Sequence, residues 1–346
     1  MKKPSILRPG DTVATVSLSW GGAGEPVIRD RYEKAKKRLT EEFGLNVIEM
    51  PHTLKGSAHV FAHPEERAKD WMAALEDPTI KGVFSCIGGE DSIRLLPYID
   101  LDVIANNPKV FLGYSDSTVS HLLCYQAGVT SFYGPSMLME FGENVAMHDY
   151  TVQSVRDNLF QDKALGVIEP SPKWTSERLE WTVKENNDTL RTMQTEAHGI
   201  ECLQGSGQVQ GHMLGGCIEV LDMVRGTSIW PSLDQWKGAI LFLETSEDCT
   251  PPGAITAMLR SMVATGAIDQ INGIIWSKPL EETHYEAYKE VIRQVIAVEA
   301  GRPDLPILYN LNFGHTSPMF TIPMGVAGQI DCDKKTFSLL EAGTSL

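Results

Sequence analysis

The sequence predicts an α/β protein whose N-terminal part is a doubly wound parallel sheet and whose C-terminal part is a second, mixed α/β domain. Apolar strand-like runs alternate with helix-like segments through the first third of the chain. A second alternation follows a long polar stretch. The length of 346 residues also fits two domains better than one.

The N-terminal elements follow one another with short connections. Pro26 and Pro64 suit the first turns of two helices, and Gly44 suits the end of the first helix. A further strand over 109–113 runs into a helix that starts near Ser115. The earlier elements are strands over 11–19, 45–51 and 80–89, and helices over 26–44 and 64–78.

The polar, turn-rich stretch over 166–206 predicts a linker that includes a tryptophan-containing loop. We therefore expect an N-terminal domain over 1–165 and a C-terminal domain over 207–346. The C-terminal elements are strands over 238–244, 271–277 and 305–315, helices over 253–267 and 284–301, and two short terminal strands.

The charge balance narrows the class of partner. Lys and Arg number 30 against 45 Asp and Glu, a net charge of -15, which repels nucleic acid and anionic membrane surfaces. No apolar run is long enough for a signal peptide or a membrane span, so we expect a cytoplasmic location. The six cysteines are scattered without a C-x-x-C pair, which indicates reduced thiols.

Ser115 has two interpretations. It lies in Gly-x-Ser-x-Ser, an imperfect form of the Gly-x-Ser-x-Gly turn that presents a nucleophile between a strand and a helix. A serine at a helix start is also a common cap. A nucleophilic serine needs a base and an orienting acid elsewhere in the chain.

Two later strand ends offer these groups. Glu244 ends the apolar strand over 238–244, and His315 ends the strand over 305–315 on a glycine-assisted turn. Glu244 could equally be a solvated residue beside Glu247 and Asp248, and His315 could be structural.

An oxyanion hole would complete such a site. The N–H of Asp116, which follows Ser115, is one candidate donor. The turn at Gly88-Gly89 is a candidate for the second, or a plain tight turn. His52, His59 and His63 match no recognised metal-ligand spacing, so we expect a solvated loop there and no metal or organic cofactor.

Four segments together resemble the LD-carboxypeptidase family of serine peptidases, over nearly the whole chain. They are CIGGED, GYSDST, LFLETSED and NFGHTSP. The resemblance implies a Rossmann-like N-terminal domain, a site between the domains and a homodimer. It also implies a nucleophile at Ser115, an acid at Glu244, a base at His315, and oxyanion donors at the N–H groups of Gly89 and Asp116.

Within that family, the length and the insertion over 173–186 favour the branch similar to the microcin C immunity peptidase. These enzymes hydrolyse an amide between an aminoacyl group and a nucleotide-like moiety, and aromatic residues cover the base. Trp174 and Trp181 match that feature. The alternatives are a murein tetrapeptide LD-carboxypeptidase and a non-catalytic ligand-binding protein.

Three residues, at two places in the chain, depart from the pattern that the resemblance implies. Cys217 stands where relatives usually have Asn after Gly-Gly. Glu247 and Asp248 follow Glu244 closely, and their charge would repel an anionic ligand.

Overall fold

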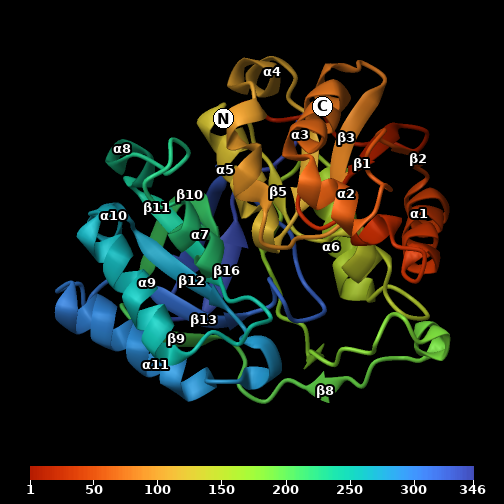
Figure 1. Ribbon diagram of the computed structural model, residues 1–346. Coiled ribbons are helices and arrows are strands. Elements are labelled where there is room, and N and C mark those ends of the chain that lie inside the picture. Colours follow the sequence, from red (N-terminus) through yellow and green to blue (C-terminus); the bar gives the residue numbers. More distant parts are fainter.

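A computed structural model describes residues 1–346, and its two main sheets confirm the predicted α/β class (Figure 1). The first sheet has the order β14-β5-β4-β3-β1-β2 and is parallel except for β14. Its strands are β1 (Thr12–Val16), β2 (Asn46–Glu49), β3 (Ile80–Ser85), β4 (Val110–Gly113), β5 (Phe132–Tyr133) and β14 (Ile322–Pro323).

Neighbouring residues of these strands face different hydrophobic clusters. Ala14 and Val83 pack into one cluster, and Val13 and Phe84 into the other. Both faces are therefore covered, as the doubly wound prediction requires. The α-helices of this half are α1 (Arg29–Phe43), α2 (Ser57–Ala62), α3 (Pro64–Glu76), α4 (Leu101–Asn106), α5 (Thr118–Gln126) and α6 (Asp149–Leu159). Shorter turns are η1 (Gly22–Gly24), η2 (Ser92–Tyr98), η3 (Ser115–Ser117) and η4 (Met137–Phe141).

The second sheet has the order β6-β16-β15-β10-β11-β12-β13-β9, and the four strands from β10 to β13 are parallel. Its strands are β6 (Gly166–Val167), β9 (Glu201–Gln204), β10 (Gln208–Cys217), β11 (Ala239–Glu244), β12 (Gly273–Ser277), β13 (Ile307–Leu311), β15 (Ala327–Asp331) and β16 (Thr336–Leu339). Its helices are α7 (Ile218–Val224), α8 (Leu233–Trp236), α9 (Pro252–Ala264), α10 (Ala267–Gln270) and α11 (Tyr285–Arg293), with η6 (Leu280–Glu282) and η7 (Gln294–Glu299).

Several predicted element bounds need correction. Helix α3 begins at Pro64 as predicted, but α1 begins at Arg29 because residues 26–28 form a turn. The helix predicted over 253–267 ends at Ala264, and Gly266, with a φ of 78°, separates it from α10. The helix predicted over 284–301 is α11 followed by a π-helical turn, η7.

The two halves of the chain share strands and core. Strand β14 from the C-terminal part pairs with β5, while β6 and β9 from the expected linker join the second sheet. One hydrophobic cluster runs from β1 and β3 of the first sheet to β10–β13 of the second. Because the halves share these strands and this core, the domain boundaries expected at 165 and 206 remain a prediction.

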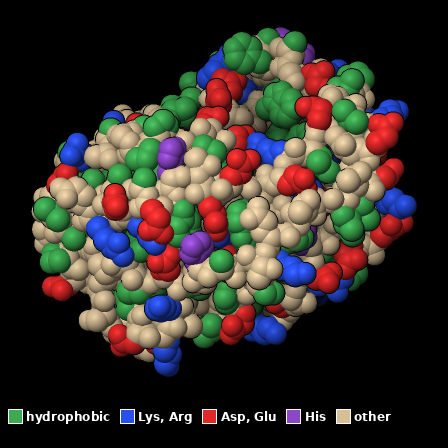
Figure 2. All heavy atoms as spheres, turned by 90° about the horizontal axis from the view of Figure 1, so that it is seen from below, with side chains coloured by type: hydrophobic (Ala, Val, Ile, Leu, Met, Phe, Trp, Pro, Cys, Tyr) green, Lys and Arg blue, Asp and Glu red, His purple; other side chains and the backbone are tan.

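The 166–206 segment runs along the lower edge of the molecule in Figure 1. It contains a small two-stranded sheet, β7 (Lys173–Trp174) with β8 (Gln194–Thr195), and the turn η5 (Lys184–Asp188). Figure 2, seen from below, shows a hollowed face on which Lys and Arg side chains are interspersed with carboxylates. None of the helices combines the length and hydrophobicity that a bilayer crossing needs.

Candidate active site

Ser115 lies on a sharp turn at the end of β4. Its φ is 61°, a left-handed conformation that costs about 1–3 kcal/mol for a residue other than glycine. The motif needs small neighbours here, because a Cβ on Gly113 would lie 2.7 Å from Ser117 Oγ. The Ser115 hydroxyl does not cap a helix; it meets the imidazole of His315.

Ser115, His315 and Glu244 form a hydrogen-bonded row. His315 Nε2 lies 3.1 Å from Ser115 Oγ, and His315 Nδ1 lies 2.6 Å from Glu244 Oε2. Ser115 follows a strand of the first sheet, while Glu244 and His315 follow strands of the second. The structure thus brings together the three residues expected to act as nucleophile, base and acid.

Glu244 is fully buried, and burial raises the pKa of its carboxyl group, against the lowering influence of His315 and Tyr133. Gly314, with a φ of 84°, lets the chain pass close to Glu244, since a Cβ there would lie 2.7 Å from Glu244 Oε2. The Gly314-His315 turn that the sequence singled out is thus needed to place the imidazole beside its acid.

Tyr133 is a site residue that sequence reasoning missed. Its hydroxyl donates to Glu244 Oε1 at 2.5 Å and accepts the Ser115 N–H at 3.0 Å. It therefore joins the turn that carries the serine to the carboxylate that orients the histidine. A tyrosine at the end of a two-residue strand carries no sequence signal of its own.

The two expected oxyanion donors belong to adjoining turns. Gly88 approaches so closely that a Cβ would lie 2.8 Å from Ser115 Cβ and 3.2 Å from the Asp116 backbone nitrogen. Asp116 Oδ2 accepts the N–H groups of Asp91 at 3.0 Å and Ser92 at 2.8 Å. The Asp116 side chain thereby fixes the segment after Gly89 against the serine turn.

A cavity of about 520 Å³ opens beside Ser115 and His315. Its aromatic lining comes from Trp20, Tyr114 and Trp181, and its positive charge from Arg178. The Arg31 guanidinium carbon lies 4.6 Å from the centre of the Trp181 ring. The Arg31 guanidinium thus holds the Trp181 ring in place by a cation–π contact, while the ring still lines the cavity.

The expectation that Trp174 also covers the substrate needs correction. Trp174 is 2% exposed and does not line this cavity. The buried Lys278 ammonium lies 4.4 Å from its ring centre. Trp174 therefore anchors the base of the loop, since its ring is packed inside the protein.

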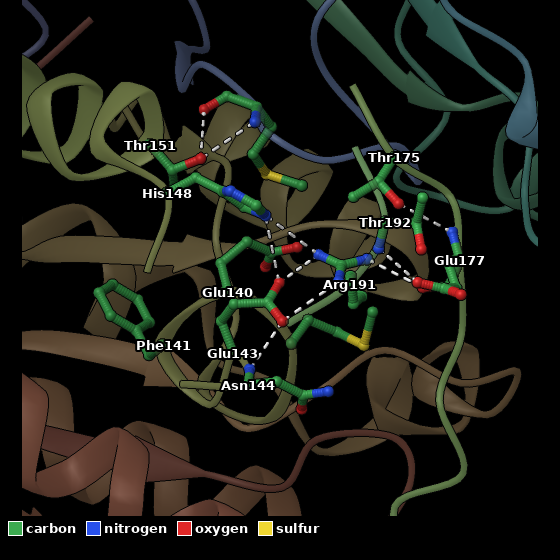
Figure 3. A network of polar contacts seen from close by, with 12 residues as sticks. Glu140, Phe141, Glu143, Asn144, His148, Thr151, Thr175, Glu177, Arg191 and Thr192 are labelled. Atoms are coloured by element: carbon green, nitrogen blue, oxygen red, sulfur yellow. Dashed lines mark hydrogen bonds and ion pairs between the residues drawn. The ribbon is translucent and has the colours of Figure 1, made fainter. Parts of the chain in front are cut away.

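The loop that carries Trp181 is pinned by a buried ion pair (Figure 3). The Arg191 guanidinium donates to both oxygens of Glu143, and its Nη1 donates to the Glu177 carbonyl oxygen at 3.2 Å. Burial opposes the charge of Glu143, but hydrogen bonds from His148 and Arg191 lower its pKa to about 2. The loop is thus held against the segment that follows η4.

The comparison with protein families is decisive at this point. Residues 13–134 match the LD-carboxypeptidase N-terminal domain, and residues 210–330 match the LD-carboxypeptidase C-terminal domain. The chain belongs to the LD-carboxypeptidase family. It is accordingly a serine peptidase-like hydrolase, as the sequence predicted.

Relatives of both predicted branches match almost the whole chain. The microcin C7 self-immunity protein MccF of Escherichia coli is 28% identical, with 97% of this chain and 94% of MccF covered. A probable murein peptide carboxypeptidase of Bacillus subtilis is 27% identical, with 99% and 95% covered. An MccF-like protein of Streptococcus pneumoniae, solved with AMP, has a TM-score of 0.88 at 34% identity, with 95% and 98% covered.

Cys217 lines a second cavity, of about 160 Å³, to which Ser115 also contributes. Its thiol donates to Glu219 Oε2 at 3.0 Å, and burial raises the pKa of that thiol well above its usual value. The charged side chains of this cavity are all acidic: Glu90, Asp116, Glu219, Glu247 and Asp248.

The Glu247 carboxylate reaches the imidazole of His315. Its Oε2 lies 2.8 Å from His315 Nε2, closer than Ser115 Oγ at 3.1 Å. Burial alone would lower the pKa of His315, but Glu244 and Glu247 together raise it to about 10. The hydrogen bond with His315 is in turn the main reason that the pKa of Glu247 falls to about 2. The two carboxylates therefore favour the protonated form of His315 in this arrangement.

We predict that Tyr133→Phe lowers both activity and stability. Removal of the hydroxyl leaves the Ser115 N–H and Glu244 Oε1 without this partner, at a cost of about 1–3 kcal/mol. We expect kcat to fall about tenfold or more, together with the thermal midpoint. Tyr125→Phe, which removes only a 3.4 Å contact with Gln235 O, is the matched control. Equal behaviour of the two variants would contradict the role of Tyr133.

We predict that Glu247→Gln shifts the pH dependence of kcat/KM. The base must be neutral, so kcat/KM of the wild type rises as pH increases through the raised pKa of His315. Loss of the Glu247 charge lowers that pKa, and the rise moves to lower pH by about one unit or more. Asp248→Asn removes an adjacent charge as a control. An unmoved pH profile in Glu247→Gln would contradict this prediction.

Proposed function

We propose that this protein hydrolyses the amide bond between an aminoacyl group and a nucleotide-like moiety, with Ser115, His315 and Glu244 as its catalytic triad. The observation that carries the proposal is the cavity of about 520 Å³ at the Ser115 hydroxyl, which has Trp181 and Trp20 in its wall. Such a volume lies within the usual range of small-molecule sites. Indole rings bind flat purines by stacking.

The comparisons support the nucleotide part of this substrate. The MccF-like protein of Streptococcus pneumoniae was solved in complex with AMP. MccF itself was solved in complex with aspartyl sulfamoyl adenosine, and that structure has a TM-score of 0.84 at 26% identity, with both chains fully covered. In the present chain, Arg178 lines the cavity, 3.7 Å from Glu247 Oε1, and its positive charge suits the linking group.

The reaction proceeds by acyl transfer. His315 Nε2 takes the proton of Ser115 Oγ as the oxygen attacks the amide carbon, and the N–H groups of Gly89 and Asp116 hold the oxyanion. His315 then gives the proton to the leaving nitrogen, whose bond to carbon breaks. Water, deprotonated by His315, releases the acyl group as a carboxylate.

This cycle needs a neutral His315 at its start. Glu247 must therefore turn away from Nε2, which lowers the pKa of His315 and lets the Nε2 proton leave to solvent, before Ser115 is activated. The five carboxylates of the smaller cavity disfavour an anionic acyl group by charge repulsion. An alanyl or lysyl group is the better choice for an assay substrate.

We expect the purified protein to release alanine or lysine from the corresponding aminoacyl-sulfamoyl adenosine, with murein tetrapeptide left intact. Mass spectrometry of both reactions measures this. Ser115→Ala should lose activity by about a thousandfold or more. Cleavage of the tetrapeptide alone would favour murein recycling, the function suggested by the similarity to the Bacillus subtilis murein peptide carboxypeptidase. Activity unchanged in Ser115→Ala would contradict the triad, and no turnover of either substrate would favour a non-catalytic ligand-binding protein.

We predict that Trp181→Ala raises KM for the nucleoside substrate about tenfold, because base stacking is worth about 1–3 kcal/mol. The reacting groups are not altered, so kcat should change little. Trp181→Phe keeps an aromatic ring and should retain most of the affinity. A loss of kcat with an unchanged KM would place Trp181 outside the base site.

A further inference from the structure

A cluster of metal-ligating side chains lies away from the triad, at the start of helix α3. One ligand atom each from His59, His63 and Glu66 lies within 4.8 Å of the others. His59 comes from the short helix α2, His63 from the junction between the helices, and Glu66 from the first turn of α3. The sequence spacing did not reveal this cluster, since its carboxylate comes from the following helix.

His52 extends the cluster from the turn after β2. Its Nε2 lies 3.3 Å from Glu66 Oε2, and the same oxygen lies 2.6 Å from His59 Nε2. The rings stack as well, with centres 5.9 Å apart for His52 and His59 and 4.2 Å apart for His59 and His63. Imidazole nitrogens from two histidines therefore converge on one carboxylate oxygen.

The outer hydrogen bonds select the tautomers that a metal requires. His52 Nδ1 lies 2.8 Å from the buried carboxylate of Asp70, which also accepts the His52 N–H at 2.8 Å. His63 Nδ1 lies 2.9 Å from the His59 carbonyl oxygen, which can only accept. In the neutral rings both Nδ1 atoms carry the proton, and each Nε2 keeps a lone pair. Carboxylate and carbonyl partners of this kind orient histidine ligands at metal sites.

With neutral histidines, the contact between His52 and Glu66 has no proton or cation between its two atoms. The Nε2 lone pair of His52 faces the Glu66 carboxylate at 3.3 Å, so two acceptors oppose each other. That separation equals the distance of about 3.3 Å between two ligands of a tetrahedral ion bound at about 2.0–2.1 Å. His59 and Glu66 would move apart by several tenths of an ångström to the same spacing.

We propose that His59, His63 and Glu66, with His52 at the edge, bind one divalent transition-metal ion of the zinc class. Two or three imidazoles with one carboxylate suit Zn²⁺ rather than Mg²⁺, which prefers oxygen ligands. On binding, the proton of His59 is exchanged through solvent from Nε2 to Nδ1, so the ring stays neutral and the Nε2 lone pair forms the metal bond. The partial exposure of His52, His59 and Glu66 leaves a path for entry.

The ion would brace one wall of the substrate cavity. The Ser57 N–H, at the start of α2, donates to Glu25 Oε1 at 2.6 Å, which ties the helix to the turn after Trp20. Trp20 lines the main cavity. The ion would link the turn after β2, α2 and α3, so its role is structural and independent of the triad.

The test is calorimetric titration of the full-length, EDTA-treated protein with ZnCl2 and, separately, with MgCl2. We expect one Zn²⁺ per chain with a Kd in the micromolar range or tighter, no comparable heat with Mg²⁺, and a thermal midpoint that rises by a few degrees with excess Zn²⁺. No zinc heat and no shift in the midpoint would overturn the proposal.

Two variants locate the ion. The double variant His59→Gln with Glu66→Gln should lose zinc affinity at least thirtyfold, whereas His198→Gln, a histidine outside the cluster, should bind as the wild type does. In EDTA, the thermal midpoint of the double variant shows whether it folds. Unchanged zinc affinity in a folded double variant would place the ion elsewhere and overturn the site.

Discussion

The buried carboxylate of Glu244 is the constraint on which this architecture depends. A charge fully removed from water is costly unless strong partners surround it. Here one oxygen accepts from Tyr133 of the first sheet and the other from His315, which follows a strand of the second. The Glu244 carboxylate has both partners only when the two sheets are in place. The hydrogen bond that orients the imidazole of His315 therefore depends on the contact between the two halves of the chain.

The surrounding packing holds the two halves of the chain firmly together. One hydrophobic cluster continues from the first sheet into the second, and β14 crosses over to pair with β5. Close approaches at Gly88, Gly113 and Gly314 leave no room for a Cβ, so the backbone itself forms the walls around Ser115 and Glu244. The strained φ of Ser115 is held by this framework, as strain at functional sites generally is.

Glu247 introduces a competing charge into that framework. It shares His315 Nε2 with Ser115, and it belongs to a cavity whose charged side chains are acidic. The site thus contains a second carboxylate that competes with Ser115 for the base. A base with two carboxylate neighbours binds its proton tightly, which links the reactivity of Ser115 to the position of one partly exposed side chain.

The α/β class, the strand and helix order and the row of Ser115, Glu244 and His315 were predictable from the sequence. The class and the order rest on local pattern, apolar strands that alternate with helices, whereas the row was assigned from the resemblance to the LD-carboxypeptidase family, since local pattern left each of its residues with two interpretations. Tyr133, the burial of Trp174, the contact between Glu247 and His315 and the grouping of His52 with Glu66 were decided by tertiary structure alone. These depend on side chains from elements far apart in the chain or on which face of a loop packs inward, and periodicity fixes neither.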